Sequence, residues 1–451
     1  ACNILQELIT NGMEDVNLYN QFAIILQKLK HHEKAELYLR KALNLARDNP
    51  DIMYNLGLNL LEQQKIAEAL NCFDTVINVF PQHIAANFKM AKFLLEQNLI
   101  LEANKYFENI FHYHKNDANL LTNIITLLLQ YENAYSYARP YCLALLKIQP
   151  NMAEIHYNLG IIASKENEIS QAIYHYEQAI ILQEKYFAAI NNLAVLHLEA
   201  RNLESAKYYF QLAHNLKPNN QSVNYTLNAL NGNSKEYKKS PNDYIINLFN
   251  NYADHYDIHL TQGLNYQVPN LIFQASKKVL DNMQNLNILD LGCGTGLCGE
   301  IFKNNKKKLI GVDLAAKMLV ICHNKQVYDE LSQEDITKYL ENCQQQFDLI
   351  TAADVFIYFG DLTNIIKLSY EKLYNNGILV FSVEIDLKSI NNNQNERIDF
   401  LMQKTGRFSH SLIYIAELAK NIGFKVKLNK TVITRTQEYQ QVKGAIIVLQ
   451  K

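Results

Sequence analysis

Residues 288–296 have the sequence Ile-Leu-Asp-Leu-Gly-Cys-Gly-Thr-Gly. The apolar residues predict the end of a buried strand, and the three glycines predict a turn directly after it. Because glycine lacks a side chain, a ligand can approach the backbone of such a turn closely. The stretch therefore predicts a nucleotide-like ligand that binds just beyond the end of a strand.

From this turn onward, short apolar runs alternate with helical stretches, a pattern typical of a mostly parallel sheet with crossover helices. We expect strands at residues 286–291, 309–313, 347–352, 378–385, 424–432 and 445–449, and a short polar strand that ends at Asp335. Together these strands predict a doubly wound α/β domain with a seven-stranded sheet.

The glycines alone do not decide which ligand binds. Residues 294–299, Gly-Thr-Gly-Leu-Cys-Gly, match the dinucleotide-binding pattern, and Asp313 follows at about the distance that this pattern needs. An NAD-dependent enzyme and a sheet without a ligand are therefore alternatives at this point.

The wider neighbourhood resembles motif I of class I S-adenosylmethionine-dependent methyltransferases, because Asp290 stands two positions before the first glycine. The resemblance implies a Rossmann-like domain with S-adenosylmethionine as cofactor and S-adenosylhomocysteine as product. It also implies that Asp290 lies near the cationic aminoacyl end of the cofactor, Asp313 at the ribose and Asp335 at the adenine. The cofactor-binding residues that it implies are Asp290, Gly292, Gly294, Gly296, Asp313, Leu314, Asp335, Ile336 and, from a motif IV-like stretch, Asp354.

Residues 249–260 resemble the lid helix of small-molecule methyltransferases, including those of quinone and biotin-precursor synthesis. Tyr252 and Tyr256 are four residues apart and share one face of the expected helix. We expect both rings to close over the cofactor, with plain core packing as the alternative.

Candidate catalytic residues follow the later strands of the expected sheet. His410 is the candidate general base, because imidazole titrates near neutral pH, and Glu384 is expected to orient it. Tyr358 lies in the same region, and Arg407 is expected to bind an acceptor carboxylate. The alternative is structural, with Arg407 and His410 anchoring the last helix and Glu384 paired with Arg407.

The residues after Asp354 narrow the range of acceptors. They read Val-Phe-Ile and lack the Pro-Pro-aromatic sequence of enzymes that methylate adenine or glutamine amides. A Pro-Cys nucleophile for cytosine is also missing there, and the net charge of -2 gives no general attraction for nucleic acid. We therefore expect an acceptor other than nucleic acid.

The N-terminal half repeats with a period of 34 residues. A small residue recurs in the first helix of each expected unit, at Ala23, Gly57, Ala91, Thr126, Gly160 and Ala194. An alanine recurs in the second helix, at Ala35, Ala69, Ala103, Ala138, Ala172 and Ala206. The fourth unit departs from the pattern: we expect one added residue before it, and a kinked or shortened helix around Pro140.

These units resemble tetratricopeptide repeats, which implies an all-α solenoid with a concave face for a protein or peptide partner. Assembly or spacing is the alternative role of such an array. We expect the solenoid at residues 1–218 with about six repeats, a capping helix and linker at 219–242, and the methyltransferase domain at 243–451. The whole arrangement resembles bacterial methyltransferases fused to tetratricopeptide repeats.

The composition is that of a globular protein, with 48% hydrophobic and 20% charged residues. The seven cysteines are scattered without the spacing of a zinc site, so we expect no metal and a reducing, cytoplasmic location. Three functions remain open: methylation of a protein or carrier-bound group recruited by the repeats, methylation of a small molecule at oxygen, and a scaffold with a retired methyltransferase fold.

Overall fold

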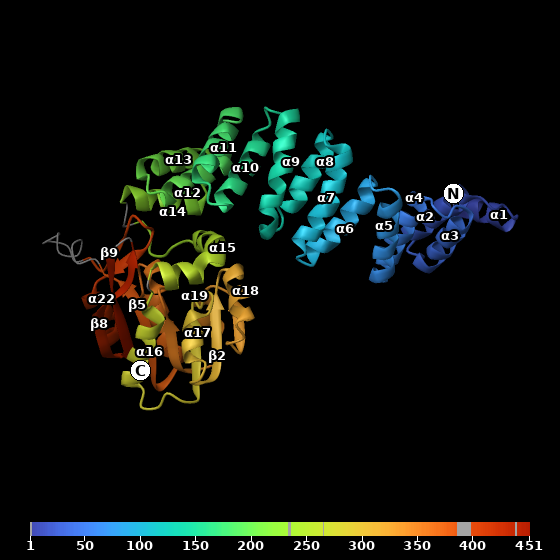
Figure 1. Cartoon of the computed structure of the whole chain (residues 1–451). Helices are drawn as coiled ribbons and strands as arrows, with labels where there is room; N and C mark the ends of the chain where they lie inside the picture. The colour runs from blue at the N-terminus through green and yellow to red at the C-terminus, as the bar shows by residue number, and fades with distance from the viewer. Residues whose placement is uncertain (1, 233–235, 265, 386–397, 438–439) are drawn as a thin grey trace. The chain divides into compact units, whose positions relative to one another are not determined.

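The computed structural model describes residues 2–232, 236–264, 266–385, 398–437 and 440–451 (Figure 1). The chain divides into two compact units, residues 1–196 and 197–451. Residues 233–235 of the expected linker lie outside the described residues. No helix in the described ranges is both long and apolar enough to cross a membrane.

The first unit is built from helices joined by short turns. Its α-helices are α1 (Cys2–Thr10), α2 (Val16–Lys28), α3 (His32–Leu45), α4 (Pro50–Glu62), α5 (Ile66–Val79), α6 (Ile84–Glu96), α7 (Ile100–His114), α8 (Ala118–Leu128), α9 (Tyr135–Ile148), α10 (Ala153–Lys165), α11 (Ile169–Leu182) and α12 (Phe187–Glu199). These helices confirm the all-α repeat region that the 34-residue period predicts.

The first helix of each of the first four units begins at a capping side chain. Asp15, Asn49, His83 and Asp117 follow one another at intervals of 34 residues, and each side chain accepts a hydrogen bond from a backbone N–H in the first turn. Such caps satisfy donors that a helix terminus leaves without partners. The period therefore records the position of helix starts as well as the packing residues.

Close packing between the two helices of a unit depends on the small residue in the first helix. A Cβ atom added to Gly57 would lie 2.6 Å from the ring of Phe73, and one added to Gly160 would lie 2.6 Å from the ring of Tyr176. The large ring of the second helix thus occupies the space that the missing side chain leaves.

The structure corrects the expected register of the fourth unit. Asp117 caps α8 at the regular 34-residue interval after His83, so no residue is added between the third and fourth units. The extra residue fits instead in the turn after α8, which forms a 3₁₀ helix, η1 (Glu132–Ala134). In the regular register Ile125 stands at the position of the small residue and is buried, whereas Thr126 is exposed.

Proline has two different effects in these helices. Pro81, Pro150 and Pro218 each stand two residues beyond a helix end, as expected from a residue that cannot continue a helix. Pro140, in contrast, lies inside α9, which retains the 14 residues of α3 and α5. Of the two expected effects, shortening of this helix is therefore wrong, and a kink at Pro140 stays a prediction.

The second unit combines the remaining helices with one mixed sheet. Its helices are α13 (Leu203–Leu216), α14 (Gln221–Asn231), α15 (Asn242–Ile258), η2 (His259–Gly263), α16 (Val268–Val279), α17 (Leu297–Phe302), α18 (Ala316–Asn324), α19 (Ile336–Asn342), η3 (Phe356–Tyr358), α20 (Thr363–Lys372) and α22 (Leu412–Ile422). Its strands are β1 (Leu286–Leu291), β2 (Lys306–Asp313), β3 (Glu330–Gln333), β4 (Phe347–Ala352), β5 (Leu373–Glu384), β6 (Phe400–Met402), β7 (Phe408–His410), β8 (Lys425–Gln437) and β9 (Gln440–Gln450).

The sheet has the doubly wound order that the sequence predicts. Strands run in the order β3-β2-β1-β4-β5, all parallel, and β5 then pairs with the antiparallel strand β9, which also pairs with β8. The structure adds a short antiparallel pair, β6 and β7, at the end of β5, so the described sheet has nine strands instead of seven. These two strands have three residues each, too few for a periodic signal in the sequence.

Helices cover both faces of the sheet (Figure 1). One core joins the sheet to α19, α20 and α22, and the other joins it to α16 and α17. Helix α14 packs on β6 and β7 through Tyr225 and Ala229. Helix α14 is therefore packed within the second unit.

We predict that Gly57→Ala destabilises the first unit by about 1 kcal/mol. Alanine is favoured over glycine inside a helix by about 1 kcal/mol, but overpacking against a buried ring costs about 1–3 kcal/mol. Thermal unfolding followed by circular dichroism checks this, with Asn71→Ala at an exposed position of α5 as the control. A variant as stable as the control would contradict the packing argument.

Candidate functional site

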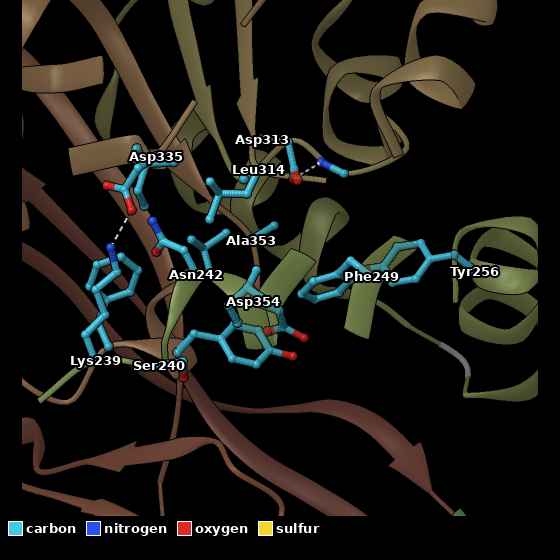
Figure 2. Close-up of a pocket in the computed structure, with 17 residues that line it drawn as sticks. Lys239, Ser240, Asn242, Phe249, Tyr256, Asp313, Leu314, Asp335, Ala353 and Asp354 are labelled. Carbon is cyan, nitrogen blue, oxygen red and sulfur yellow. Dashed lines mark hydrogen bonds and ion pairs between the residues drawn. The ribbon is translucent and has the colours of Figure 1, made fainter. Parts of the chain in front are cut away.

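A pocket of about 650 Å³ lies beyond the carboxyl ends of the parallel strands (Figure 2). The lining residues come from the turns after β1, β2, β3 and β4, from α15, and from the segment before α15. They are Lys239, Ser240, Asn242, Ile245, Phe249, Tyr256, Gly292, Gly294, Asp313, Leu314, Asp335, Ile336, Ala353, Asp354, Val355, Tyr358 and Phe359.

The glycine turn after β1 forms one wall of the pocket. Gly292, Gly294 and Gly296 all have positive φ angles, which glycine adopts without strain. A Cβ on Gly292 would clash with Val355, whereas a Cβ on Gly294 would meet no protein atom within 4 Å. Gly294 thus presents bare backbone to the pocket, while Gly296 begins α17 and does not line it.

Asp313 stands at the end of β2 and ties two turns together. Its Oδ2 accepts a hydrogen bond from the Gly294 N–H at 2.9 Å, and its Oδ1 accepts one from the Ala315 N–H at 2.8 Å. Burial raises the pKa of this carboxyl, and the backbone N–H bonds oppose that effect. Leu314 lines the pocket beside it (Figure 2).

Asp335 and Ile336 begin α19 at the opposite side of the pocket. Asp335 Oδ1 caps this helix by accepting hydrogen bonds from the N–H groups of Thr337 and Lys338 at 2.9 and 3.3 Å. Its Oδ2 lies 2.5 Å from Lys239 Nζ, a partner that the sequence did not suggest (Figure 2). Burial tends to raise the pKa of Asp335, but the bond to Lys239 and the backbone donors lower it overall.

Asp290 does not occupy the position that we expected at the aminoacyl end. It is 2% exposed and does not line the pocket. Its oxygens accept hydrogen bonds from the hydroxyls of Tyr328 at 2.6 Å and Thr351 at 2.8 Å. Burial raises its pKa to about 6. Its carboxylate therefore connects β1 to Thr351 of β4 and to Tyr328.

His410 is likewise placed away from the pocket, which corrects its assignment as general base. It is fully buried in β7, and its Nε2 lies 2.8 Å from the carbonyl oxygen of Phe359 and 3.1 Å from that of Gly360. Because carbonyls only accept, Nε2 carries the proton. Burial lowers the pKa of His410 to about 4. The ring is a fixed donor that holds the loop after β4.

Glu384 pairs with arginines and does not orient His410. Its Oε1 contacts Arg407 at 3.3 Å and, more closely, Arg435 of β8. Arg435 also contacts Asp354 Oδ2 at 3.4 Å and is only 5% exposed. The expected alternative, a Glu384–Arg407 pair, is therefore present. Reasoning from sequence missed Arg435, because only the long β8 strand brings it back to the end of β4.

Asp354 and Tyr358 are the polar side chains on the β4 side of the pocket. Asp354 adopts a left-handed conformation with φ of 55°, and its Oδ1 accepts a hydrogen bond from Ser382 at 2.8 Å. Burial raises the pKa of Asp354, and Arg435 partly offsets this. Tyr358 is buried, and its ring packs edge-on against Phe249 of α15.

The two tyrosines of the expected lid have different positions. Tyr256 lines the pocket, whereas Tyr252 packs against Tyr256 and His259 and does not line it. Helix α15 is anchored through Asp257, which accepts hydrogen bonds from Thr295 of the glycine turn and from Lys325. The lid helix is therefore fixed directly to the turn that it covers.

Comparison with protein families gives matches in both units. A family model described as a methyltransferase domain matches residues 264–428, which include β1 to β5. The chain carries a methyltransferase domain. Models of the tetratricopeptide repeat match residues 16–49 and 51–83, so the N-terminal helices include tetratricopeptide repeats. The methyltransferase match supports S-adenosylmethionine as the cofactor, as the glycine turn and Asp313 predict.

Several curated proteins are similar to parts of the chain. An uncharacterized protein of Haemophilus influenzae is 32% identical over 114 residues, which is 24% of this chain and 45% of that protein. A malonyl-[acyl-carrier protein] O-methyltransferase of Acetivibrio thermocellus is 27% identical over 107 residues, or 23% of this chain and 37% of that protein. The chain spans less than half the length of the curated relatives that it matches.

One similar solved structure is magnesium protoporphyrin IX methyltransferase from Synechocystis with bound S-adenosylmethionine. It is 13% identical with a TM-score of 0.31, and the match covers 41% of this chain and 79% of that one.

Among the described residues of the present chain, no group of three or more His, Cys, Asp or Glu side chains is arranged to hold a metal ion.

We predict that His410→Gln removes an acid sensitivity of the methyltransferase domain. The folded domain keeps His410 neutral down to about pH 4, whereas the unfolded chain takes up the proton near pH 6.5. Acid between these values therefore favours unfolding, by up to about 3 kcal/mol. Urea unfolding at pH 7.5, 5.5 and 4.5 should show that the free energy of unfolding falls less with acid in His410→Gln than in the wild type.

His323→Gln, at an exposed position of α18, is the control and should follow the wild type. Equal acid sensitivity of His410→Gln and the wild type would show that His410 does not contribute this effect.

Proposed function

We propose that the methyltransferase domain binds S-adenosylmethionine in the pocket of Figure 2 and transfers its methyl group to an acceptor that enters beside Asp354 and Tyr358. The observation that carries the proposal is the pairing of Gly294 with Asp313. Gly294 leaves room for a ligand against the backbone, and a carboxylate at the end of β2 is suited to accept hydrogen bonds from both ribose hydroxyls.

The other lining residues fit the remaining parts of this cofactor. Leu314 and Ile336 provide apolar surface for a flat base, and Asp335 provides an acceptor for an amino group. Tyr256 and Phe249 of α15 cover the pocket and help to exclude water. S-adenosylmethionine supplies an electrophilic methyl carbon on a sulfonium, and the residues of this chain must align an acceptor with it.

We propose Asp354 as the proton acceptor for a hydroxyl or amine substrate, in place of His410. It lines the pocket, and burial raises its pKa, which makes its carboxylate a stronger proton acceptor. Ser382 and Arg435 hold its two oxygens, so its orientation is fixed. Tyr358 lies beside it and is proposed to orient the acceptor.

Calorimetric titration of the full chain with S-adenosylhomocysteine tests the cofactor site. We expect binding by the wild type and a loss of at least about 100-fold in Asp313→Asn, because hydrogen bonds to a charged group contribute about 1.5–3 kcal/mol each. Asp281→Asn, at an exposed position, is the matched control and should bind like the wild type. No binding by the wild type would favour the retired scaffold.

We propose that the acceptor is a protein or a carrier-bound group recruited by the repeats. The repeat family and the carrier-bound substrate in the name of the Acetivibrio thermocellus relative support this class. The alternative is methylation of a free small molecule at oxygen, with the repeats serving assembly, and the aromatic side chains of α15 that line the pocket support it.

Labelling with methyl-labelled S-adenosylmethionine separates these acceptors. The full chain is incubated with cell lysate separated into protein and small-molecule fractions, with Asp313→Asn as the inactive control. We expect label in the protein fraction that depends on Asp313. Label confined to the small-molecule fraction would replace the proposed acceptor by the alternative.

A further inference from the structure

The segment between α14 and α15 is bound to the methyltransferase domain along its backbone. The Lys238 carbonyl accepts hydrogen bonds from the N–H groups of Gly360 at 2.8 Å and Asp361 at 3.0 Å. The Ser240 N–H donates to the Tyr358 carbonyl at 2.9 Å, and Lys239 forms a bridge with Phe359. We call residues 236–241 the strap, because they lie across the loop that follows β4.

The side chain of Lys239 reaches from the strap to Asp335 (Figure 2). Its Nζ lies 2.5 Å from Asp335 Oδ2 and 4.9 Å from the centre of the Phe359 ring. The side chain of Asp335 is 7% exposed and that of Lys239 is 35% exposed, so the pair is partly shielded from water. Because Asp335 Oδ1 caps α19, the ion pair with Lys239 fixes the second oxygen of the carboxylate.

Tyr225 of α14 holds the other side of the strap. Its hydroxyl donates to the Gly406 carbonyl at 2.6 Å and lies 2.7 Å from Ser240 Oγ, which donates in turn to the tyrosine oxygen. The ring is fully buried and packs against Tyr237 and Tyr244. Tyr225 itself does not line the pocket.

We propose that the strap is a wall of the cofactor pocket, that Lys239 is a positioning residue for Asp335, and that α14 sets cofactor affinity through Tyr225. This inference rests on the proposed function, because it takes the pocket to be the site of S-adenosylmethionine. Lys239 keeps the Asp335 carboxylate in the orientation that receives the cofactor's amino group. Less side-chain conformational entropy is therefore lost when the cofactor binds. Helix α14 is then connected to the methyl-transfer site through the strap.

The test is calorimetric titration of the full chain with S-adenosylhomocysteine. Lys239→Met keeps most of the length of the side chain and removes its charge, and it should raise Kd about fivefold, the size expected for one partly exposed ion pair. Lys239→Arg keeps the charge and should restore most of the affinity. Tyr225→Phe should raise Kd in the same direction, although residue 225 does not touch the ligand.

Lys308→Met is the matched control. Lys308 pairs with Glu330 at 2.7 Å, and its side chain is 35% exposed, as is that of Lys239, but it lies outside the pocket. We expect the wild-type Kd for this variant. Thermal unfolding without ligand separates loss of folding from loss of binding, since Lys239→Met removes only a partly exposed side chain.

Wild-type affinity in both Lys239→Met and Tyr225→Phe would overturn the inference and leave the proposed function intact. An equal loss of affinity in Lys239→Met and Lys308→Met would also overturn it, because the effect would then be one of general charge. Absence of binding by the wild type would instead reject the proposed function, and the inference with it.

Discussion

The carboxylate of Asp313 joins the two turns on which the pocket depends. One oxygen receives the N–H of Gly294 from the turn after β1, and the other receives the N–H of Ala315 at the start of α18. Two neighbouring parallel strands therefore end at one shared acceptor, and their turns are fixed relative to each other. Helix α15 adds a second connection, because Asp257 binds Thr295 of the same glycine turn. Helix α15 and the two turns of the pocket are thus held together by a few charge-assisted hydrogen bonds.

The charged residues near Asp354 restrict which methyl acceptors can bind there. Two arginines, Arg407 and Arg435, meet two carboxylates, Glu384 and Asp354, in a largely buried cluster. Buried charges are costly unless they are paired, and here each has a partner. A methyl acceptor with a carboxylate group would have to compete with Glu384 for Arg407. The pair therefore argues against Arg407 as the residue that binds an acceptor carboxylate. A neutral hydroxyl or amine beside Asp354 would leave the cluster intact.

The sequence predicted those features that depend on residues close together in the chain. The glycine turn, the strand ends at Asp313 and Asp354, and the repeat period are local patterns, so their positions followed from spacing. The roles of His410 and Arg435 were not predictable in this way. His410 titrates near neutral pH in isolation, but the fold directs its Nε2 at two carbonyls. Arg435 reaches Asp354 and Glu384 only through the pairing of β8 with β9 and of β9 with β5.

The strap shows why composition alone misjudges a connecting segment. Lysine and serine between two helices are typical of a solvated linker, yet the backbone of Lys238 and Ser240 is paired with the loop after β4. In an extended segment successive side chains point to opposite sides. Lys239 therefore meets Asp335 while Ser240 meets Tyr225, and one short segment contacts both the pocket and α14.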